Sequence, residues 1–212
     1  MNISQSQHKF LIMAFGIAAI GAELFNSPLF IALKPLCTIS ILAYLLIFRN
    51  TASNSYSKRI GIGLFFCLIG DTFLLFESYF IWGLASFLVA HLIFLYAFVK
   101  RQGWLWEPKV AVVLALIALG IFTLVSDNLD SLFYPVLIYL IVIVLMSWQG
   151  WALALNPKME YRSFFGWAVS LFLFSDALIA IDKFYFSFSF SGILILSTYW
   201  IAIFLIARSV SK

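Results

Sequence analysis

Long apolar runs, separated by short clusters of charged, glycine and proline residues, dominate the chain. A bilayer core about 30 Å thick needs about 20 consecutive apolar residues for each helix that crosses it. Divided at its polar and Gly/Pro positions, the sequence gives eight runs of about this length. The pattern therefore predicts an all-α fold, a polytopic transmembrane bundle of eight helices, over residues 9–25, 28–48, 60–77, 80–100, 109–126, 132–154, 163–182 and 189–208.

Composition supports this reading. Hydrophobic residues make up 64% of the 212 positions and charged residues 10%, whereas globular domains average about 45–50% and about 25%. The connecting segments are too short for a soluble domain, so we expect one transmembrane domain over residues 1–212, with antiparallel neighbouring helices. The first run is short and follows His8 and Lys9, which leaves a cleaved signal peptide as an alternative to a retained helix.

The basic residues predict an orientation. Cytoplasmic loops of membrane proteins carry an excess of Lys and Arg. Of the 13 such residues, only Lys34 and Lys183 lie on the side opposite the two chain ends, so we expect both termini in the cytoplasm. The excess of basic residues is then a topology signal and a contact with anionic lipid, and it does not indicate a nucleic-acid partner. The residues on the cytoplasmic side are Lys9, Arg49, Lys58, Arg59, Lys100, Arg101, Lys109, Lys158, Arg162, Arg208 and Lys212.

Metal and cofactor motifs are not found in the sequence. Cys37 and Cys67 lie inside apolar runs and are expected to be small buried hydrophobic residues rather than a disulfide or metal pair. His8 and His91 are the two histidines, too few for a three-histidine metal site. No Gly-rich phosphate loop, Walker motif or Cys-x-x-Cys is present. We therefore expect no cofactor and no bound metal.

Ionisable residues inside the predicted spans are the candidates for function, because lipid penalises them. Four such residues stand out, and all four are predicted to lie between the bilayer midplane and its outer third. Tyr199 is placed at a similar depth, beside Trp200. A common depth on several helices is what a single polar cavity requires. The ionisable candidates are Lys34, Asp71, His91 and Asp176.

Each candidate also has a purely structural interpretation. Lys34 can extend its amine to the outer headgroups, with Pro35 marking a kink. His91 can hydrogen-bond a neighbouring helix, and Tyr199 can belong to the core. The two aspartates can form structural hydrogen bonds or an ion pair with Lys34. Solvation is the simplest interpretation of the charged residues at helix ends, which are Glu23, Glu77, Asp182 and Lys183.

The two halves of the chain resemble each other weakly. Residues 70–75, which begin Gly-Asp, end the third span, and residues 175–180, which begin Ser-Asp, end the seventh. Both spans run in the same direction. A parallel four-plus-four repeat, over about 1–104 and 105–212, would relate the two aspartates by a pseudo-twofold axis normal to the membrane.

The residues around these candidates occur as short motifs in a fixed order along almost the whole chain. With them the sequence resembles the YhhN family of multi-pass membrane proteins, whose characterised members are lysoplasmalogenases. The motifs are Lys34-Pro35-Leu36, Leu68-Ile69-Gly70-Asp71 with Leu74 and Leu75, Gly83 to Phe87 with Ala90-His91-Leu92 and Tyr96, Phe174-Ser175-Asp176-Ala177-Leu178, and Thr198-Tyr199.

The resemblance implies an eight-helix fold that cleaves the vinyl ether bond of lysoplasmalogens. The products would be a fatty aldehyde and a glycerophospho-ethanolamine or glycerophosphocholine. The substrate would then be a lysophospholipid, with water as the second reactant. The two intramembrane aspartates that are thought to be catalytic in the family correspond to Asp71 and Asp176.

This chemistry suits two carboxyl groups. A vinyl ether is opened by acid: protonation of its outer alkene carbon gives an oxocarbenium ion, which water traps as a hemiacetal. One aspartate would serve as the acid and the other as the carboxylate that stabilises the cation and activates water. Lys34 or His91 would set which aspartate keeps the proton, although Lys34 could instead meet the lipid phosphate. Direct addition of water predicts carboxyl groups about 6.5–9.5 Å apart.

Other classes stay open at this point. Serine and zinc hydrolysis are disfavoured, because the chain has no Gly-x-Ser-x-Gly and only one intramembrane histidine. Buried Asp and His residues and parallel repeats also occur in proton-coupled transporters. A structural membrane protein without a site would leave two mid-membrane carboxylates unexplained. The short chain and the lack of a retention signal favour a bacterial inner membrane. Headgroup preference and oligomeric state are not predicted.

Overall fold

The computed structural model describes residues 4–49, 54–159 and 162–210. Within these residues the eight predicted helices are confirmed, and three short 3-10 turns lie in the loops between them. The helices are α1 (Gln5–Leu24), α2 (Phe30–Phe48), α3 (Asn54–Phe73), α4 (Phe80–Gln102), α5 (Pro108–Val125), α6 (Phe133–Leu155), α7 (Arg162–Phe184) and α8 (Ser191–Arg208). The 3-10 turns are η2 (Glu77–Tyr79), η3 (Ser126–Asn128) and η4 (Asp130–Leu132).

The bounds of α3 differ most from the prediction, whereas those of the other helices lie within four residues of it. The third helix was expected over residues 60–77, but α3 begins at Asn54 and ends at Phe73. Its first turns are helical although they are polar, because Tyr56 and Ser57 are buried and the Tyr56 hydroxyl lies 3.0 Å from Ser209 Oγ beyond the end of α8. Tertiary contacts thus extend the helix at its polar end. Because α3 ends at Phe73 rather than at residue 77, Asp71 lies in its last turn.

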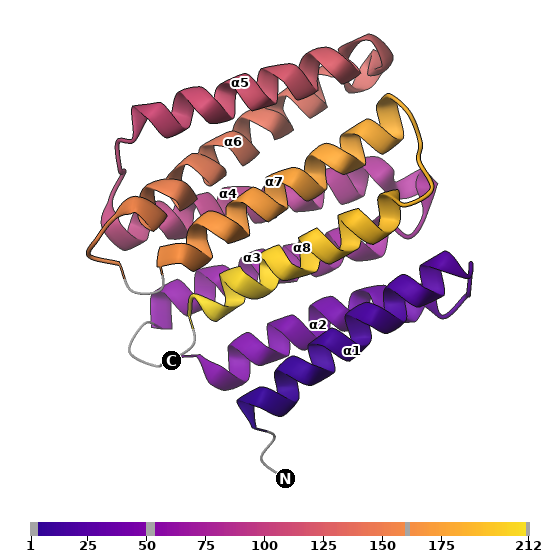
Figure 1. Cartoon of the computed structure of the whole chain (residues 1–212), viewed down its shortest axis with the longest axis horizontal. Coiled ribbons are helices and arrows are strands. Elements are labelled where there is room, and N and C mark those ends of the chain that lie inside the picture. The colour runs from indigo at the N-terminus through magenta and orange to yellow at the C-terminus, as the bar shows by residue number, and fades with distance from the viewer. Residues whose placement is uncertain (1–3, 50–53, 160–161, 211–212) are drawn as a thin grey trace.

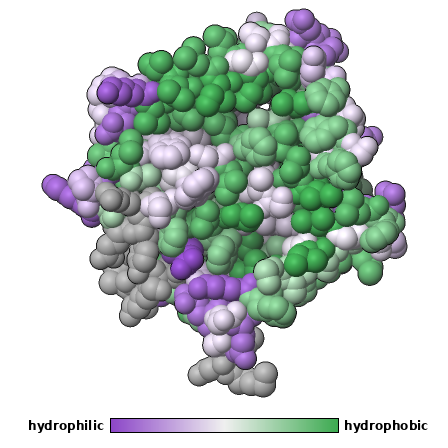
Figure 2. Space-filling model, viewed as in Figure 1, coloured by the Kyte–Doolittle hydropathy of each residue, from purple (hydrophilic) through white to green (hydrophobic). Residues whose placement is uncertain are grey.

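The surface is suited to lipid. Large apolar side chains are exposed on many helices, for example Phe10 of α1 at 68% and Trp167 of α7 at 65%. Figure 2 shows that apolar side chains cover most of the visible face and that hydrophilic ones gather at its edges. By length and composition, six of the described helical segments could cross a membrane: Phe30–Phe48, Glu77–Gln102, Pro108–Asn128, Asp130–Leu155, Ser163–Phe184 and Ser191–Arg208. The chain is an integral multi-pass membrane protein.

The helices lie side by side, with α7 and α8 in front of α4 and α3 in the view of Figure 1. Both chain ends are at the same end of the bundle. The most extensive contacts join α3 to α4 and α7 to α8, while α2 packs on α8 and α6 packs on α4. The contacts between consecutive helices of the first half, α1–α2, α2–α3 and α3–α4, thus have counterparts in α5–α6, α6–α7 and α7–α8, and α2–α8 has one in α4–α6. This is the pattern that a parallel four-plus-four repeat would give, and the repeat itself stays a prediction.

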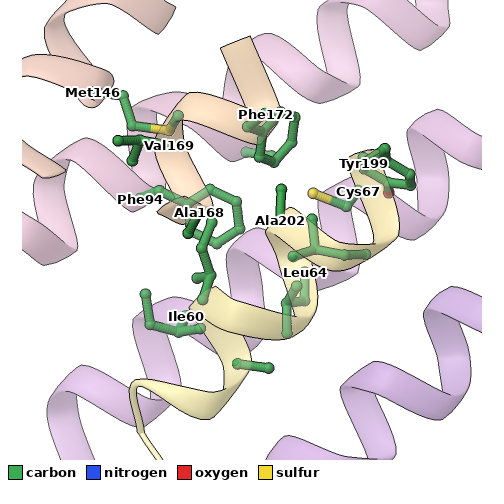
Figure 3. Packing of buried hydrophobic residues seen from close by; sticks show 14 of the residues in the cluster. Ile60, Leu64, Cys67, Phe94, Met146, Ala168, Val169, Phe172, Tyr199 and Ala202 are labelled. Carbon is green, nitrogen blue, oxygen red and sulfur yellow. The ribbon is translucent and has the colours of Figure 1, made fainter. Parts of the chain in front are cut away.

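The core fills the space between α3, α4, α6, α7 and α8 (Figure 3). Phe94 and Phe172 are fully buried there. Glycines let neighbouring helices approach closely, and Gly63 and Gly150 are two examples. A side chain at Gly63 would overlap the Phe94 ring on α4, and a side chain at Gly150 would overlap Val169 on α7. Small residues at such crossings are typical of helix packing in membranes.

Candidate active site

Asp71 is a buried carboxylate held by two helices other than its own. It is 1% exposed, and its Oδ2 accepts a hydrogen bond from Thr38 Oγ1 of α2 at 2.5 Å. The same oxygen accepts one from the Tyr199 hydroxyl of α8 at 2.8 Å. Trp200 Nε1 in turn donates to Thr38 Oγ1 at 3.3 Å. Two short hydroxyl donors on one oxygen compensate a negative charge in the interior.

Asp176 lies in the middle part of α7 and has a different set of partners. Its Oδ2 accepts a hydrogen bond of 2.6 Å from the Tyr139 hydroxyl of α6. His91 Nε2 of α4 lies 3.7 Å from the same oxygen, which is too long for a hydrogen bond. The His91 ring is completely buried, and within the described part of the chain neither of its nitrogens has a hydrogen-bond partner. A buried polar group without a partner is costly, so this one calls for a functional explanation.

The site thus consists of two half-sites. The Asp71 half-site is Asp71 with Thr38 and Tyr199, and the Asp176 half-site is Asp176 with Tyr139 and His91. The partners come from α2 and α8 in the first and from α6 and α4 in the second. In the predicted repeat α2 corresponds to α6 and α8 corresponds to α4. Each aspartate therefore receives its partners from corresponding helices of the two halves.

A single ring connects the half-sites. The Phe172 ring lies edge-on to His91, with centroids 4.6 Å apart, and to Tyr199, with centroids 5.6 Å apart. Across the described residues no hydrogen bond joins the two aspartates directly. The carboxyl separation expected from the chemistry stays a prediction. The structure does bring one member of each half-site, His91 of α4 and Tyr199 of α8, against the same aromatic side chain of α7.

Lys34 is set apart from both half-sites. Its side chain is 7% exposed, yet its amine makes no hydrogen bond or ion pair with any residue that the structure describes. It interacts electrostatically with Asp71 and with Glu23, and it lies over the Phe30 ring at 5.8 Å from the centroid. The sequence left open whether Lys34 or His91 sets which aspartate keeps the proton. In the structure each is near a different aspartate: Lys34 is near Asp71, and His91 is near Asp176.

The amine of Lys34 faces a polar cavity at the end of the bundle opposite the chain ends. We call this cavity, of about 270 Å³, the vestibule. It is formed where α1, α3 and α7 end and where α2, α4 and α8 begin. Three acidic and two basic side chains line it: Glu23, Glu77, Asp182, Lys34 and Lys183.

Asp176 lies between the vestibule and a large apolar groove. A cavity of about 50 Å³, lined by Asp176 and Tyr139, adjoins the vestibule because both include Leu74, Phe80 and Ile179. A second cavity, of about 40 Å³, is lined by the same Asp176 and Tyr139 on the other side.

This second cavity adjoins an apolar groove of about 550 Å³ between α5 and α7, because both include Ile121, Leu173 and Ala177. The groove runs from Ala177 towards Lys109 at the far end of α5. Polar vestibule, carboxylate and apolar groove thus follow one another in space. An amphiphile with a charged head and a long chain has the same order of parts.

Two residues of the half-sites were not predicted from the sequence. Thr38 and Tyr139 are common residue types in apolar helices, and neither stands in a distinctive motif. The weak repeat held a signal for both: Thr38 precedes Asp71 by one helix, as Tyr139 precedes Asp176. The contacts themselves, Thr38 with Asp71 and Tyr139 with Asp176, depend on the packing of α2 on α3 and of α6 on α7.

The donor set for a metal is small. No group of three or more His, Cys, Asp or Glu side chains stands together in residues 4–49, 54–159 and 162–210. His91 and Asp176 are the closest combination of imidazole and carboxylate. A pair of ligands is fewer than the three protein ligands typical of a catalytic zinc site.

Comparison with known proteins places the chain among relatives. The model described as YhhN family matches residues 29–210. "Lysoplasmalogenase TMEM86A" of Bos taurus is 35% identical over 159 residues, which are 72% of this chain and 65% of that protein. "Lysoplasmalogenase TMEM86B" of Rattus norvegicus is 26% identical over 185 residues, or 87% of this chain and 75% of that protein. The match to human "Lysoplasmalogenase TMEM86A" is 32% identical and again covers 65% of that protein.

The chain thus spans about two thirds of the length of these TMEM86A relatives. No solved structure matches it significantly.

Proposed function

The chain belongs to the YhhN family, and on this premise we propose that it is a lysoplasmalogenase. The reaction would hydrolyse the vinyl ether bond of a lysoplasmalogen to a fatty aldehyde and glycerophospho-ethanolamine or glycerophosphocholine. The observation that carries the proposal is the position of Asp176, which lines cavities on both sides, between a polar vestibule and an apolar groove. The activity printed in the names of the relatives supports it.

The arrangement suggests how the substrate lies. The alkenyl chain would occupy the groove between α5 and α7, whose lining is almost wholly apolar. The glycerol would occupy the small cavity towards the vestibule, which Phe80, Phe87 and Phe184 help to line. The vinyl ether, which lies between chain and glycerol, would then be next to Asp176 and Tyr139. A carboxyl group that meets the reacting bond directly is what general acid catalysis requires.

In this scheme Asp176 supplies the proton. Its carboxyl protonates the outer alkene carbon, and the double-bond electrons form the new C–H bond while an oxocarbenium ion develops at the carbon attached to oxygen. Water adds to that carbon and gives a proton to the Asp176 carboxylate, which restores the acid and leaves a hemiacetal. Collapse of the hemiacetal breaks the C–O bond and gives aldehyde and alcohol. Apart from one water molecule consumed, no other reactant is needed.

Asp71 would be the second carboxylate. It is fixed by two hydroxyl donors and interacts electrostatically with Lys34, so a negative charge here is compensated before substrate arrives. A fixed charge of this kind stabilises a cation that develops nearby without reorganisation of its surroundings. Phe172, in contact with both half-sites, would keep them at a constant separation.

Orientation and location complete the proposal. With both chain ends in the cytoplasm, as the basic residues predict, the vestibule opens to the outer leaflet. We place the protein in a bacterial inner membrane. A parallel repeat of two four-helix halves would explain why each aspartate receives its partners from equivalent helices.

The test is aldehyde release from a lysoplasmalogen by the detergent-purified protein. We expect turnover by the wild type without any ion gradient, and a loss of about 10²–10⁴ in kcat for Asp176→Asn. Asp71→Asn should lose activity as well, with helicity and thermal stability retained in both variants. Asp127→Asn, which removes an exposed carboxylate from η3, is the matched control. A folded wild type that releases no aldehyde at any pH would contradict the proposal and favour a proton-coupled carrier.

A further inference from the structure

The vestibule contains two kinds of charged residue. Those at its rim satisfy each other or the backbone. Lys183 Nζ lies 3.5 Å from Glu77 Oε1, and the Glu77 side chain is 94% exposed. Asp182 Oδ1 accepts hydrogen bonds from Ser187 Oγ and from the backbone N–H of Phe188. These three rim residues therefore do not need a ligand.

The two inner residues lack such partners. Lys34 is more than nine-tenths buried and lines the vestibule, and no described residue pairs with its amine. Glu23 Oε2 is buried and also has no hydrogen-bond partner among the described residues. A charge out of water without a partner is strongly disfavoured. Lys34 and Glu23 interact only electrostatically, because no ion pair within 4.0 Å joins them.

The backbone of α8 leaves room for the Glu23 carboxylate. Gly192 lies in the first turn of α8, and a side chain at this position would overlap the carboxylate of Glu23. The N-terminal turn of a helix also favours a neighbouring negative charge. The carboxylate is thus held at one side of the vestibule, while the amine of Lys34 enters from α2.

We infer that the vestibule binds the zwitterionic headgroup of a lysophospholipid, with the phosphate on Lys34 and the ammonium on Glu23. This rests on the proposed function and extends it to headgroup recognition. One zwitterionic group supplies both missing counter-charges, whereas a free phosphate or a neutral glycerol supplies one or none. The headgroup position agrees with the reaction site, because the vestibule adjoins the cavity lined by Asp176. Glu23 and Lys34 are then the residues that determine headgroup selectivity.

The experiment measures binding separately from turnover. Saturated 1-O-alkyl lysolipids have no vinyl group and cannot be opened by acid in this way, but they keep the headgroup and chain. Three such probes carry phosphoethanolamine, phosphate alone, or no phosphate. Their affinities for the detergent-purified protein would be measured by the change in tryptophan fluorescence and by the shift in Tm.

We expect the wild type to bind the phosphoethanolamine probe at least about tenfold more tightly than either other probe, since a charge-assisted contact has roughly this effect. Lys34→Met should remove the advantage of the phosphate probe over the neutral one and reduce that of the phosphoethanolamine probe, which keeps its contact with Glu23. Glu23→Gln should remove only the advantage of phosphoethanolamine over phosphate. Gly192→Ala should displace the Glu23 carboxylate and have the same effect as Glu23→Gln.

Unchanged affinity for the neutral probe shows that each variant is folded, and Asp127→Asn, outside the vestibule, should keep the wild-type ranking. Equal affinity of the wild type for the three probes would overturn the inference, as would an unchanged ranking in Lys34→Met. If the ranking holds and no aldehyde is released from a lysoplasmalogen, headgroup recognition stands and the proposed hydrolysis fails. If aldehyde is released but the three probes bind equally, the proposed hydrolysis stands and headgroup recognition by Lys34 and Glu23 fails.

Discussion

Tyr139 donates a 2.6 Å hydrogen bond to the same Asp176 oxygen that faces His91 Nε2 at 3.7 Å. One oxygen is therefore bonded and the hydroxyl fixes the direction of the carboxyl group. The ring of Tyr139 also lies edge-on to His91, with centroids 5.2 Å apart. The orientation of the acid thus depends on α6, a helix that contains no Asp, Glu, Lys, Arg or His.

Tyr139→Phe should reduce kcat roughly 10- to 100-fold, because it removes a short hydrogen bond to a carboxyl group and keeps the ring packing. The change would be measured by aldehyde release at saturating substrate. Tyr134→Phe on the same helix, where the side chain is 72% exposed, should leave kcat unchanged. Equal kcat for Tyr139→Phe and wild type would show that the hydroxyl does not position the acid.

Thr38→Val and Tyr199→Phe should have effects that exceed their sum when combined. Both hydroxyls donate to Oδ2 of Asp71, so either one alone still compensates part of the charge. With both removed, the carboxylate keeps no hydrogen-bond donor to that oxygen. A double-mutant cycle on Tm and on kcat should give a coupling of about 0.5–3 kcal/mol.

The single variants also distinguish this network from ordinary packing. Thr38→Val is close to isosteric, and Tyr199→Phe keeps the ring contacts to Phe87 and Phe172. Strict additivity would mean that the two donors act independently of Asp71. As a control, Thr123→Val changes an exposed hydroxyl that bonds only to its own helix.

The sequence predicts a helix end well where hydropathy sets it, and poorly where contacts with distant residues set it. Length and hydropathy decide most of the helices, and the predicted limits of α4 and α8 lie within two residues of the observed ones. They fail at α3, where contacts of Tyr56 and Ser57 with the rest of the bundle extend a helix through polar residues. Burial by distant residues is not encoded in the local pattern.

The candidate site follows the same logic. Lipid penalises ionisable residues, so Asp71, Asp176, Lys34 and His91 stand out in the sequence alone. Their grouping does not, because the half-sites depend on which helices pack together. Hydroxyl groups carry no such penalty, because a threonine can bond to its own helix and a tyrosine can belong to the core. Thr38 and Tyr139 were therefore missed.

Gly150→Ala should lower stability, whereas Gly120→Ala should not. A methyl group at Gly150 would overlap Val169 of α7, while nothing lies within 4 Å of the position of a methyl group at Gly120. Overpacking costs about 1–3 kcal/mol, and replacing Gly by Ala inside a helix gains up to about 1 kcal/mol. The Tm in detergent should fall by several degrees for Gly150→Ala and stay level or rise for Gly120→Ala. A fall of equal size in both would show that the α6–α7 crossing is not tightly packed.

Ile117→Trp should change the chain-length preference of the proposed hydrolysis. Ile117 lines the apolar groove between α5 and α7 at a point beyond Ile121, as seen from Asp176, so a larger side chain would obstruct the distal part of a long alkenyl chain only. We expect kcat/KM for an 18-carbon substrate to fall at least about fivefold, and that for a 10-carbon substrate to change little.

Ile17→Trp provides the matched control, since Ile17 lines another apolar groove, between α1 and α8, that includes neither aspartate. If Ile17→Trp rather than Ile117→Trp selects against long chains, the chain enters between α1 and α8. Asp71, which Trp200 of that groove reaches through Thr38, would then be the carboxylate next to the vinyl ether.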